Sequence, residues 1–206
     1  MDILGKLFGG TARIKIMRLF LLNPELAFLN RDIAYRSKVS GSTVRRETGM
    51  LYSVGFIRYK RFFKERKPRI NSKGKPGKKA VIGWQLDPAF PLLNQFYNLL
   101  SSSGPIKTED IVTRCRRGGK VKLIIISGIF IHDPDSRVDL LIVGDRLKRG
   151  MLEQSIRLIE AEVGRELHYA VFDTKDFLYR HGMYDKFIRD ILDYPHEKIF
   201  DKIGID

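Results

Sequence analysis

Residues 33–61 read IAYRSKVSGSTVRRETGMLYSVGFIRYKR, and this stretch decides the fold of the N-terminal half. Its apolar residues recur at helical spacing as far as Gly55 and then alternate with Arg58 and Lys60, so the period changes from 3.6 to 2. Ser40 can cap the second helical pattern through its hydroxyl, and Gly55 can take the left-handed conformation that ends a helix. The stretch therefore predicts a helix-turn-helix followed by a strand.

The flanking sequence predicts the rest of the N-terminal half. Residues 12–20 have helical spacing that stops at Asn23-Pro24, because proline disfavours helix at the residue before it. Phe28 and Leu29 hint at a short strand, and Asn30 can cap the next helix. Residues 80–86 alternate as a second hairpin strand, and apolar residues from Phe90 to Leu100 suggest a further helix.

The second helix of a helix-turn-helix enters the major groove of DNA with its N-terminal part. We expect Val44, Leu51 and Val54 to point inward from this helix, and small polar side chains and arginines to point outward. Hydroxyls suit phosphates, and arginine can also bind the edge of guanine. The predicted DNA-contacting residues are Ser40, Ser42, Thr43, Arg45 and Arg46.

A long basic segment separates the two predicted strands. Residues 64–79, KERKPRINSKGKPGKK, hold eight basic residues, one acidic residue, two prolines and two glycines. This composition resists packing and predicts a positively charged wing that contacts phosphates or the minor groove. The predicted contacts are Lys64, Arg66, Lys67, Arg69, Lys73, Lys75, Lys78 and Lys79.

Charge is distributed unevenly along the 206 residues. The formal net charge is +14, and residues 1–105 carry all of this excess, since residues 106–206 hold equal numbers of basic and acidic side chains. A basic half predicts a polyanionic partner.

The single cysteine, Cys115, excludes a disulfide framework and a multi-thiolate zinc site. Neither a secretory signal nor an apolar run long enough for a membrane span is evident, which predicts a cytoplasmic protein without membrane association.

Residues 11–87 resemble a bacterial-type winged helix-turn-helix transcriptional regulator. The resemblance rests on the turn, on the Ser-Thr-Val-x-Arg start of the recognition helix and on the Gly-Phe-Ile entry to the wing. It implies three helices plus a β-hairpin wing, sequence-specific binding to double-stranded DNA, and binding as a homodimer. The helix around residues 92–100 could serve as the dimer element or could complete the domain core. The sequence departs from the family pattern in Glu47-Thr48-Gly49 and in its long wing.

A composition break at residues 101–105 predicts a linker, with one domain at 1–105 and another at 106–206. The second half alternates helical and strand patterns, which predicts an α/β domain whose sheet is covered by helices. The expected elements are a helix from about Thr108, strands at 121–127, 138–143 and 167–172, a helix at 150–163, and C-terminal helices.

The segment LIIISGIFIHDPDSRVDLLIVGD, residues 123–145, resembles the minimal, polymerase-beta-like nucleotidyltransferase domain. Residues 164–180 and 187–204 are similar to later parts of such domains in regulators. Members carry a Gly-Ser pair after the first strand to hold nucleotide phosphates. They also carry Asp-x-Asp on the second strand, where side chains two apart share a face and can hold two divalent cations.

This chain departs from that pattern in two places. The pair is reversed as Ser127-Gly128, and Arg137 stands at the first carboxylate position, so Asp139 alone remains of Asp-x-Asp. A guanidinium does not ligate a cation. For the third carboxylate, His168 is near the relevant place, with Asp173 just beyond. Ser127, Gly128 and Asp139 are therefore predicted to be vestiges of an active site, with no metal site.

The sequence thus predicts an α+β protein of two domains, an N-terminal winged helix and a C-terminal nucleotidyltransferase-like domain with a mixed sheet. We expect a DNA-binding transcriptional regulator whose second domain senses, dimerises or recruits. The alternative is an active metal-dependent nucleotidyltransferase with a basic nucleic-acid tether, in which Asp139 and one of Asp133, Asp135 or Asp173 hold Mg²⁺. A third possibility is nucleotide binding without turnover, with Arg137 contacting a phosphate.

Overall fold

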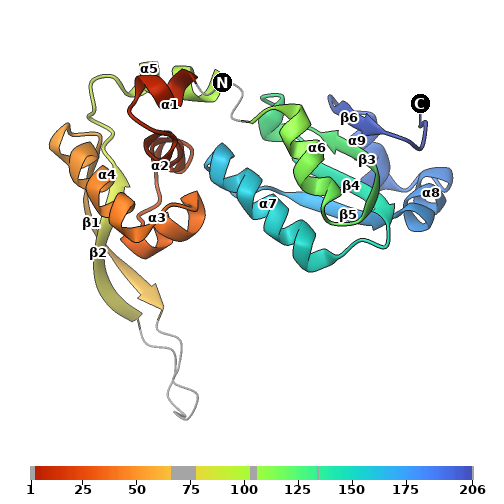
Figure 1. Cartoon of the computed structure of the whole chain (residues 1–206), viewed down its shortest axis with the longest axis horizontal. Coiled ribbons are helices and arrows are strands. Elements are labelled where there is room, and N and C mark those ends of the chain that lie inside the picture. The colour runs from red at the N-terminus through yellow and green to blue at the C-terminus, as the bar shows by residue number, and fades with distance from the viewer. Residues whose placement is uncertain (1–2, 66–77, 103–105, 134, 206) are drawn as a thin grey trace, which may run out of the picture. The chain divides into compact units, whose positions relative to one another are not determined.

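The computed structural model describes residues 3–65, 78–102, 106–133 and 135–205 (Figure 1). The chain is α+β and divides into two compact units, Met1–Ser103 with Val163–Arg165, and Gly104–Glu162 with Glu166–Asp206. No helix within the described ranges is long and apolar enough to cross a membrane. Five predicted wing contacts lie outside the described residues, namely Arg66, Lys67, Arg69, Lys73 and Lys75.

Helices and one hairpin form the first unit. The helices are α1 (Ile3–Leu7), α2 (Thr11–Leu21), α3 (Asn30–Ser37), α4 (Gly41–Ser53) and α5 (Leu93–Ser102). Their apolar faces meet in one core that includes the fully buried side chains of Phe20, Ile33 and Leu51. The helices expected from hydrophobic spacing in this half are therefore confirmed.

Strands β1 (Ile57–Glu65) and β2 (Lys78–Leu86) pair antiparallel, with Ile57 opposite Leu86, as predicted for the hairpin. Phe28 forms a bridge to the hairpin, since its backbone N–H and C=O exchange hydrogen bonds of 2.8 and 2.9 Å with Trp84. A Cβ on Gly83 would lie 2.5 Å from the carbonyl oxygen of Phe28. Glycine at this position allows the backbone of the Phe28 segment to approach β2 closely.

The capping predictions had mixed outcomes. Ser40 caps α4, and its hydroxyl accepts a 3.3 Å hydrogen bond from the backbone N–H of Thr43. The expectation that Asn30 caps α3 is wrong, because the helix begins at Asn30 and its side chain instead accepts a 2.8 Å hydrogen bond from the indole N–H of Trp84. Val54 is also not inward, since it follows the last residue of α4 and is 55% exposed. Gly55 has φ +76°, as the predicted helix end requires.

A four-stranded mixed sheet forms the centre of the second unit, in the order β5-β4-β3-β6. Only β4 and β5 are parallel to each other. The elements are α6 (Thr108–Arg116), β3 (Lys120–Ile126), the 3₁₀ turn η1 (Gly128–Phe130), β4 (Leu140–Asp145), α7 (Arg149–Val163), β5 (Tyr169–Asp173), α8 (Thr174–Gly182), α9 (Lys186–Leu192) and β6 (Glu197–Asp201).

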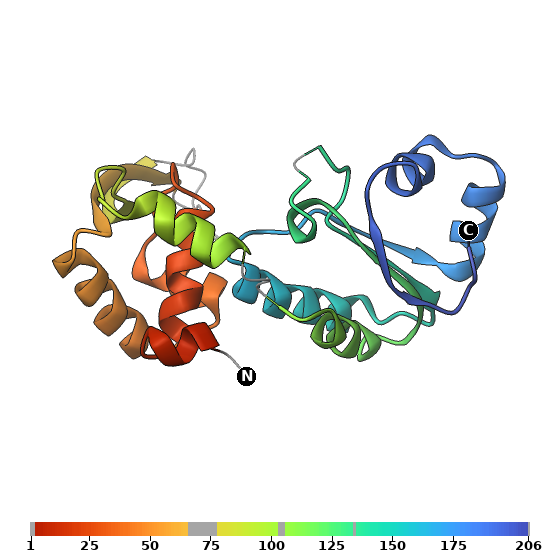
Figure 2. The same ribbon diagram turned by 90° about the horizontal axis from the view of Figure 1, so that it is seen from above.

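Helices cover both faces of this sheet. Helices α6 and α7 lie on one face and α8 and α9 on the other (Figure 2). On the α8–α9 face, Leu123 and Leu141 pack with Phe177 and Ile188. The sequence patterns missed β6, which pairs antiparallel with β3 at the edge of the sheet. A short strand after two helices, half exposed and containing charged residues, has no strong period-2 signal.

Substitution by alanine should change the stability of the first unit in opposite directions at Gly49 and at Gly83. A Cβ on Gly49 meets no atom within 4 Å, so Gly49→Ala should stabilise the unit by about 1 kcal/mol through helix propensity. Gly83→Ala should destabilise it, because the new methyl group meets the backbone of Phe28. Urea unfolding followed by the fluorescence of Trp84, the single tryptophan, reports on this unit. Equal effects of the two substitutions would contradict this account of the hairpin.

Candidate nucleic-acid interface

One side of α4 is exposed along most of its length. Ser42, Arg45, Gly49 and Tyr52 are spaced by three or four residues, and all four are exposed. With 3.6 residues per turn, such positions form a single stripe along the helix. The buried residues Val44, Glu47, Thr48 and Leu51 form its inner side. The stripe on α4 thus consists of Ser42, Arg45, Gly49 and Tyr52.

The hydroxyl groups at the start of α4 bind one another. The Oγ atom of Ser40 lies 3.1 Å from that of Ser42 and 2.9 Å from Oγ1 of Thr43. Ser40 therefore serves the helix cap, while Ser42 and Thr43 stand in the first turn, where backbone N–H groups have no acceptor within the helix. Such a helix start favours negative charge, including phosphate.

A buried carboxylate orders two arginines beside the stripe. Glu47 has a side chain only 4% exposed, and its two oxygens accept hydrogen bonds from Arg13 on α2 at 2.8 Å and from Arg46 at 3.0 Å. Burial raises the pKa of Glu47, but the hydrogen bonds and charges of both arginines outweigh it, so the net pKa lies below 4.5. Arg46 is thus partly neutralised, which the sequence pattern did not show.

The basic side chains predicted to contact DNA differ in whether they already form an ion pair within the protein. The side chain of Arg45 is exposed and makes no ion pair or hydrogen bond with any described side chain or backbone group, so its guanidinium is available to a ligand. Lys64 instead holds the carboxylate of Asp32 on α3, with both oxygens at 2.7 and 2.8 Å. Lys78 and Lys79 at the start of β2 are exposed. Of the predicted contacts that are described, Arg45, Lys78 and Lys79 present charge that is not paired with any described side chain.

An aromatic cluster at the base of the hairpin was not expected from the sequence. The rings of Tyr59 and Trp84, opposite each other on β1 and β2, stack at 4.4 Å. The ring of Tyr52, at the end of the stripe, lies 4.8 Å from Tyr59 and 5.5 Å from Trp84. The signal was present in the spacing of Tyr52 from Arg45 and Gly49, which places all three on one side of α4.

In the second unit, Ser127 and Gly128 follow β3 and are engaged by their own loop. The buried hydroxyl of Ser127 donates a hydrogen bond to the carbonyl of Val138. Gly128 has φ +58°, and a Cβ there would overlap the carboxylate of Asp139. Both residues therefore fit closely against the chain just before β4.

Asp139 holds two backbone segments together. Its Oδ1 accepts a 2.9 Å hydrogen bond from the N–H of Ile129, and its Oδ2 accepts one of 2.8 Å from the N–H of His168. The backbone N–H of Asp139 donates at 2.6 Å to the carbonyl of His168. The carboxylate thus joins the turn after β3 to the start of β5.

The residues at this end of the sheet do not fit a two-cation site. Arg137 stands where the resemblance places a first carboxylate, and its guanidinium pairs with Asp190 on α9 at 2.8 Å. Asp173 lies at the other end of β5, opposite Gly144, and caps α8 by accepting a hydrogen bond from the backbone N–H of Lys175. The nearest ring nitrogen of His168 lies 3.8 Å from the carboxylate of Asp139. Among the described side chains, no group of three His, Cys, Asp or Glu is placed to hold a metal ion.

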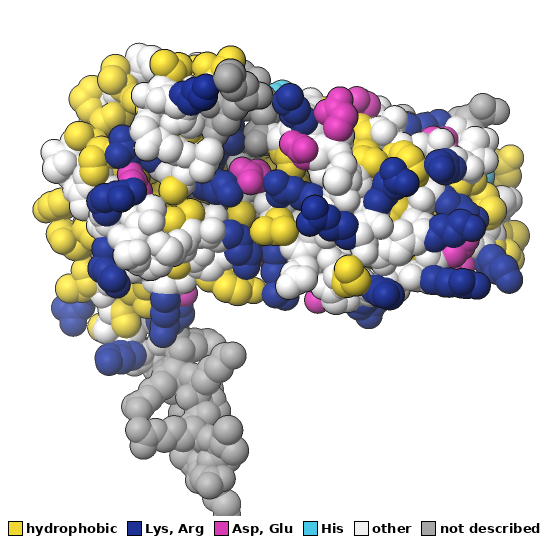
Figure 3. Space-filling model, in the orientation of Figure 1, with side chains coloured by type: hydrophobic (Ala, Val, Ile, Leu, Met, Phe, Trp, Pro, Cys, Tyr) yellow, Lys and Arg dark blue, Asp and Glu magenta, His cyan; other side chains and the backbone are white. Residues whose placement is uncertain are grey.

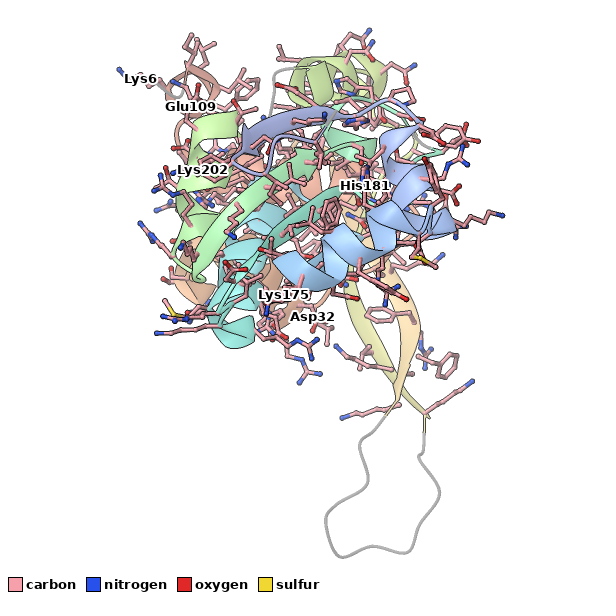
Figure 4. All side chains as sticks on the ribbon, turned by 90° about the vertical axis from the view of Figure 1, so that its right-hand side faces the viewer. Lys6, Asp32, Glu109, Lys175, His181 and Lys202 are labelled. Carbon is pink, nitrogen blue, oxygen red and sulfur yellow. The ribbon has the colours of Figure 1, made fainter. Side chains whose placement is uncertain are left out.

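Two further side chains of reactive type, His181 and Cys115, pack within the second unit. His181 lies on α8 (Figure 4), where its ring stacks on Phe177 at 6.2 Å. Cys115 is fully buried, and burial raises the pKa of its thiol to about 12 despite the opposing charge of Arg114. The thiol is therefore neutral at physiological pH and acts as a small apolar side chain.

Comparison of the chain with protein-family models, with curated proteins and with solved structures found no significant match.

Glu47 should make the stability of the first unit depend on acid pH. Because its pKa is lowered in the folded state, its contribution is present above the usual value of 4.5 and is lost as pH falls through the folded pKa. Glu47→Gln should cost roughly 1–3 kcal/mol at pH 7, since a charge-assisted pair is broken. Urea unfolding of both proteins from pH 7 to pH 3 should show the difference shrinking below pH 4.5. A difference that is constant with pH would contradict this role.

Asp139 should be structural. Asp139→Ala should lower the unfolding free energy of the second unit by roughly 2–5 kcal/mol, because two hydrogen bonds to a charged group are lost. Amide exchange at Ile129 and His168 should quicken, which hydrogen-exchange mass spectrometry or NMR can measure. Asp193→Ala, which removes an exposed pair with Arg189, is the control and should cost less than about 1 kcal/mol. Unchanged protection at both amides would contradict the assignment.

Proposed function

We propose that the protein is a sequence-specific regulator that binds double-stranded DNA through α4 and the β1–β2 hairpin of a winged-helix unit. The observation that carries the proposal is the stripe on α4. It presents Arg45 without a partner among the described residues, beside a capped helix start, in the half that carries the whole net charge of +14. The order of α2, α3, α4 and hairpin, with Phe28 bridged to Trp84, supports a winged helix.

Charge on the surface is consistent with this assignment. Dark blue side chains are interspersed over α4 and the stem of the hairpin (Figure 3). Cations beside phosphates release condensed counterions, so affinity for DNA should fall steeply with salt. The arginines and lysines of this unit supply this salt-dependent part of the affinity, while the stripe on α4 supplies contacts to base edges.

For the second unit we propose a non-catalytic role in sensing, dimerisation or recruitment. Asp139 serves backbone hydrogen bonds and Arg137 serves an ion pair, so neither favours the two-cation chemistry of the alternative, an active nucleotidyltransferase. Magnesium-dependent incorporation of label from a nucleoside triphosphate, abolished by Asp139→Asn, would overturn this part of the proposal.

We further propose that the protein binds DNA as a homodimer through α5. Phe96 and Leu100 of this helix complete the core, while Leu92, Tyr97 and Leu99 are exposed. Residues 88–106 contain no charged side chain, in a chain that is 30% charged. A charge-free apolar surface is where two copies of a basic unit can approach each other with least repulsion.

Arg45→Ala should relax sequence preference by about 1–3 kcal/mol if Arg45 reads a base. The measurement is fluorescence anisotropy on the duplex upstream of the protein's own gene and on a scrambled duplex, at several salt concentrations. The wild type should prefer the native duplex, and Arg45→Ala should lose most of that preference. Arg157→Ala, an exposed arginine of α7, is the matched control and should retain it. Equal binding of both duplexes by the wild type at every salt concentration would overturn specific recognition.

A further inference from the structure

The outer face of the hairpin is apolar and exposed. Because side chains alternate along a strand, Tyr59 and Phe63 of β1 share a face with Ile82 and Trp84 of β2. Tyr59, Phe63 and Ile82 are 57%, 69% and 65% exposed, respectively. Figure 4 shows side chains projecting to both sides of the hairpin stem. Exposed aromatic side chains of this kind are unfavourable in water and mark a contact surface.

This face continues the stripe on α4. Tyr52 is the last member of the stripe, and its ring contacts both Tyr59 and Trp84. A ligand that lies along Arg45 and Gly49 therefore meets the aromatic face of the hairpin next. The further inference consequently rests on the proposed function, in which α4 holds DNA.

The opposite face fixes the hairpin in place. Lys64 on that face binds Asp32 of α3, and Gly83 allows close packing against the backbone of Phe28. The described part of the hairpin is thus a platform anchored to α3 and to the Phe28 segment. The aromatic face is presented to a ligand with little ordering cost.

Charge identifies the kind of ligand. Strands β1 and β2 carry six basic residues and one acidic residue. Arg61 and Lys78 lie on the aromatic face, whereas Lys60 and Lys79 lie on the opposite face. All four are exposed, and none makes an ion pair with a side chain that the structure describes. A second copy placed face to face would bring like charges together, whereas a polyanion would neutralise them. The face fits a nucleic acid better than another copy of this chain.

Aromatic and aliphatic surface gains nothing from phosphates, but it stacks well on the flat faces of bases. In an intact duplex those faces are hidden within the stack. We propose that the Tyr59–Phe63–Ile82 face binds bases that have left the duplex, so that the protein prefers DNA with a few unpaired bases beside the site held by α4. Arg61, between Tyr59 and Phe63 on the same face, would hold the backbone of the displaced strand.

The test compares a fully paired duplex with the same duplex carrying a four-nucleotide mismatched bubble beside the binding site, for both the native upstream sequence and its scrambled version. Anisotropy should show the wild type binding the bubble about tenfold more tightly, as expected for one stacked base. A 2-aminopurine in the bubble should be quenched on binding. Phe63→Ala should reduce both effects to less than about twofold, because it removes the ring that stacks on a base. Phe63 is 69% exposed, so the removal of its ring should leave the fold intact. Tyr179→Ala, an equally exposed aromatic residue on α8, should retain both effects.

The outcomes separate this inference from the proposed function. Equal binding of bubble and duplex by the wild type, or a bubble preference and a quench that Phe63→Ala leaves intact, would overturn the inference even if α4 reads the native sequence. A bubble preference on native and scrambled DNA alike, lost in Phe63→Ala, supports the hairpin face even if sequence recognition fails. If Phe63→Ala changes the oligomeric mass of the protein in solution but not its preference for the bubble, the face binds a second copy of the chain. The inference is then wrong.

Discussion

Trp84 connects the parts of the first unit, and the position of the hairpin depends on it. Its backbone pairs with Phe28, its indole N–H donates to Asn30 at the start of α3, and its ring contacts the rings of Tyr59 and Tyr52. These contacts reach α3, α4 and both hairpin strands from one side chain. Because an isolated two-stranded hairpin is only marginally stable in water, such anchoring allows β1 and β2 to stand away from the core.

The acidic residues of the basic unit have a complementary role. Glu47 and Asp32 each pair with two cations that would otherwise repel one another. These are Arg13 and Arg46 for Glu47, and Lys64 and Arg31 for Asp32. A carboxylate inside a strongly positive unit is stabilised by the field of its neighbours, and in return it fixes their direction. The unit therefore divides its cations into a structural set and a free set that includes Arg45.

The sequence predicted elements where a local signal is strong and failed where a distant partner decides. The change of period after Gly55, the hydroxyl of Ser40 and the alternation of the hairpin are all local, and the structure confirms the elements they predict. Asn30 is a residue type that commonly caps helices, but its side chain accepts a hydrogen bond from the indole N–H of Trp84, 54 residues away in the sequence. The same applies to Lys64, whose place in a basic run hides its ion pair with Asp32, and to the weakly patterned edge strand β6.

The candidate site in the second unit shows why a motif and a site differ. The segment around Ser127 and Asp139 resembles a nucleotide-binding loop only in part, since the Gly-Ser pair is reversed and Arg137 replaces a carboxylate. The structure does place Ser127 beside Asp139, whose carbonyl accepts a 3.0 Å hydrogen bond from the N–H of Ser127. Their polar atoms, however, are used by the fold, since Ser127 binds Val138 and Asp139 binds the amides of Ile129 and His168. Backbone N–H groups are suitable partners for a carboxylate, because each donates a charge-assisted hydrogen bond. Arg137 likewise pairs with Asp190 of α9, so the charged side chains around this loop are engaged by other parts of the second unit.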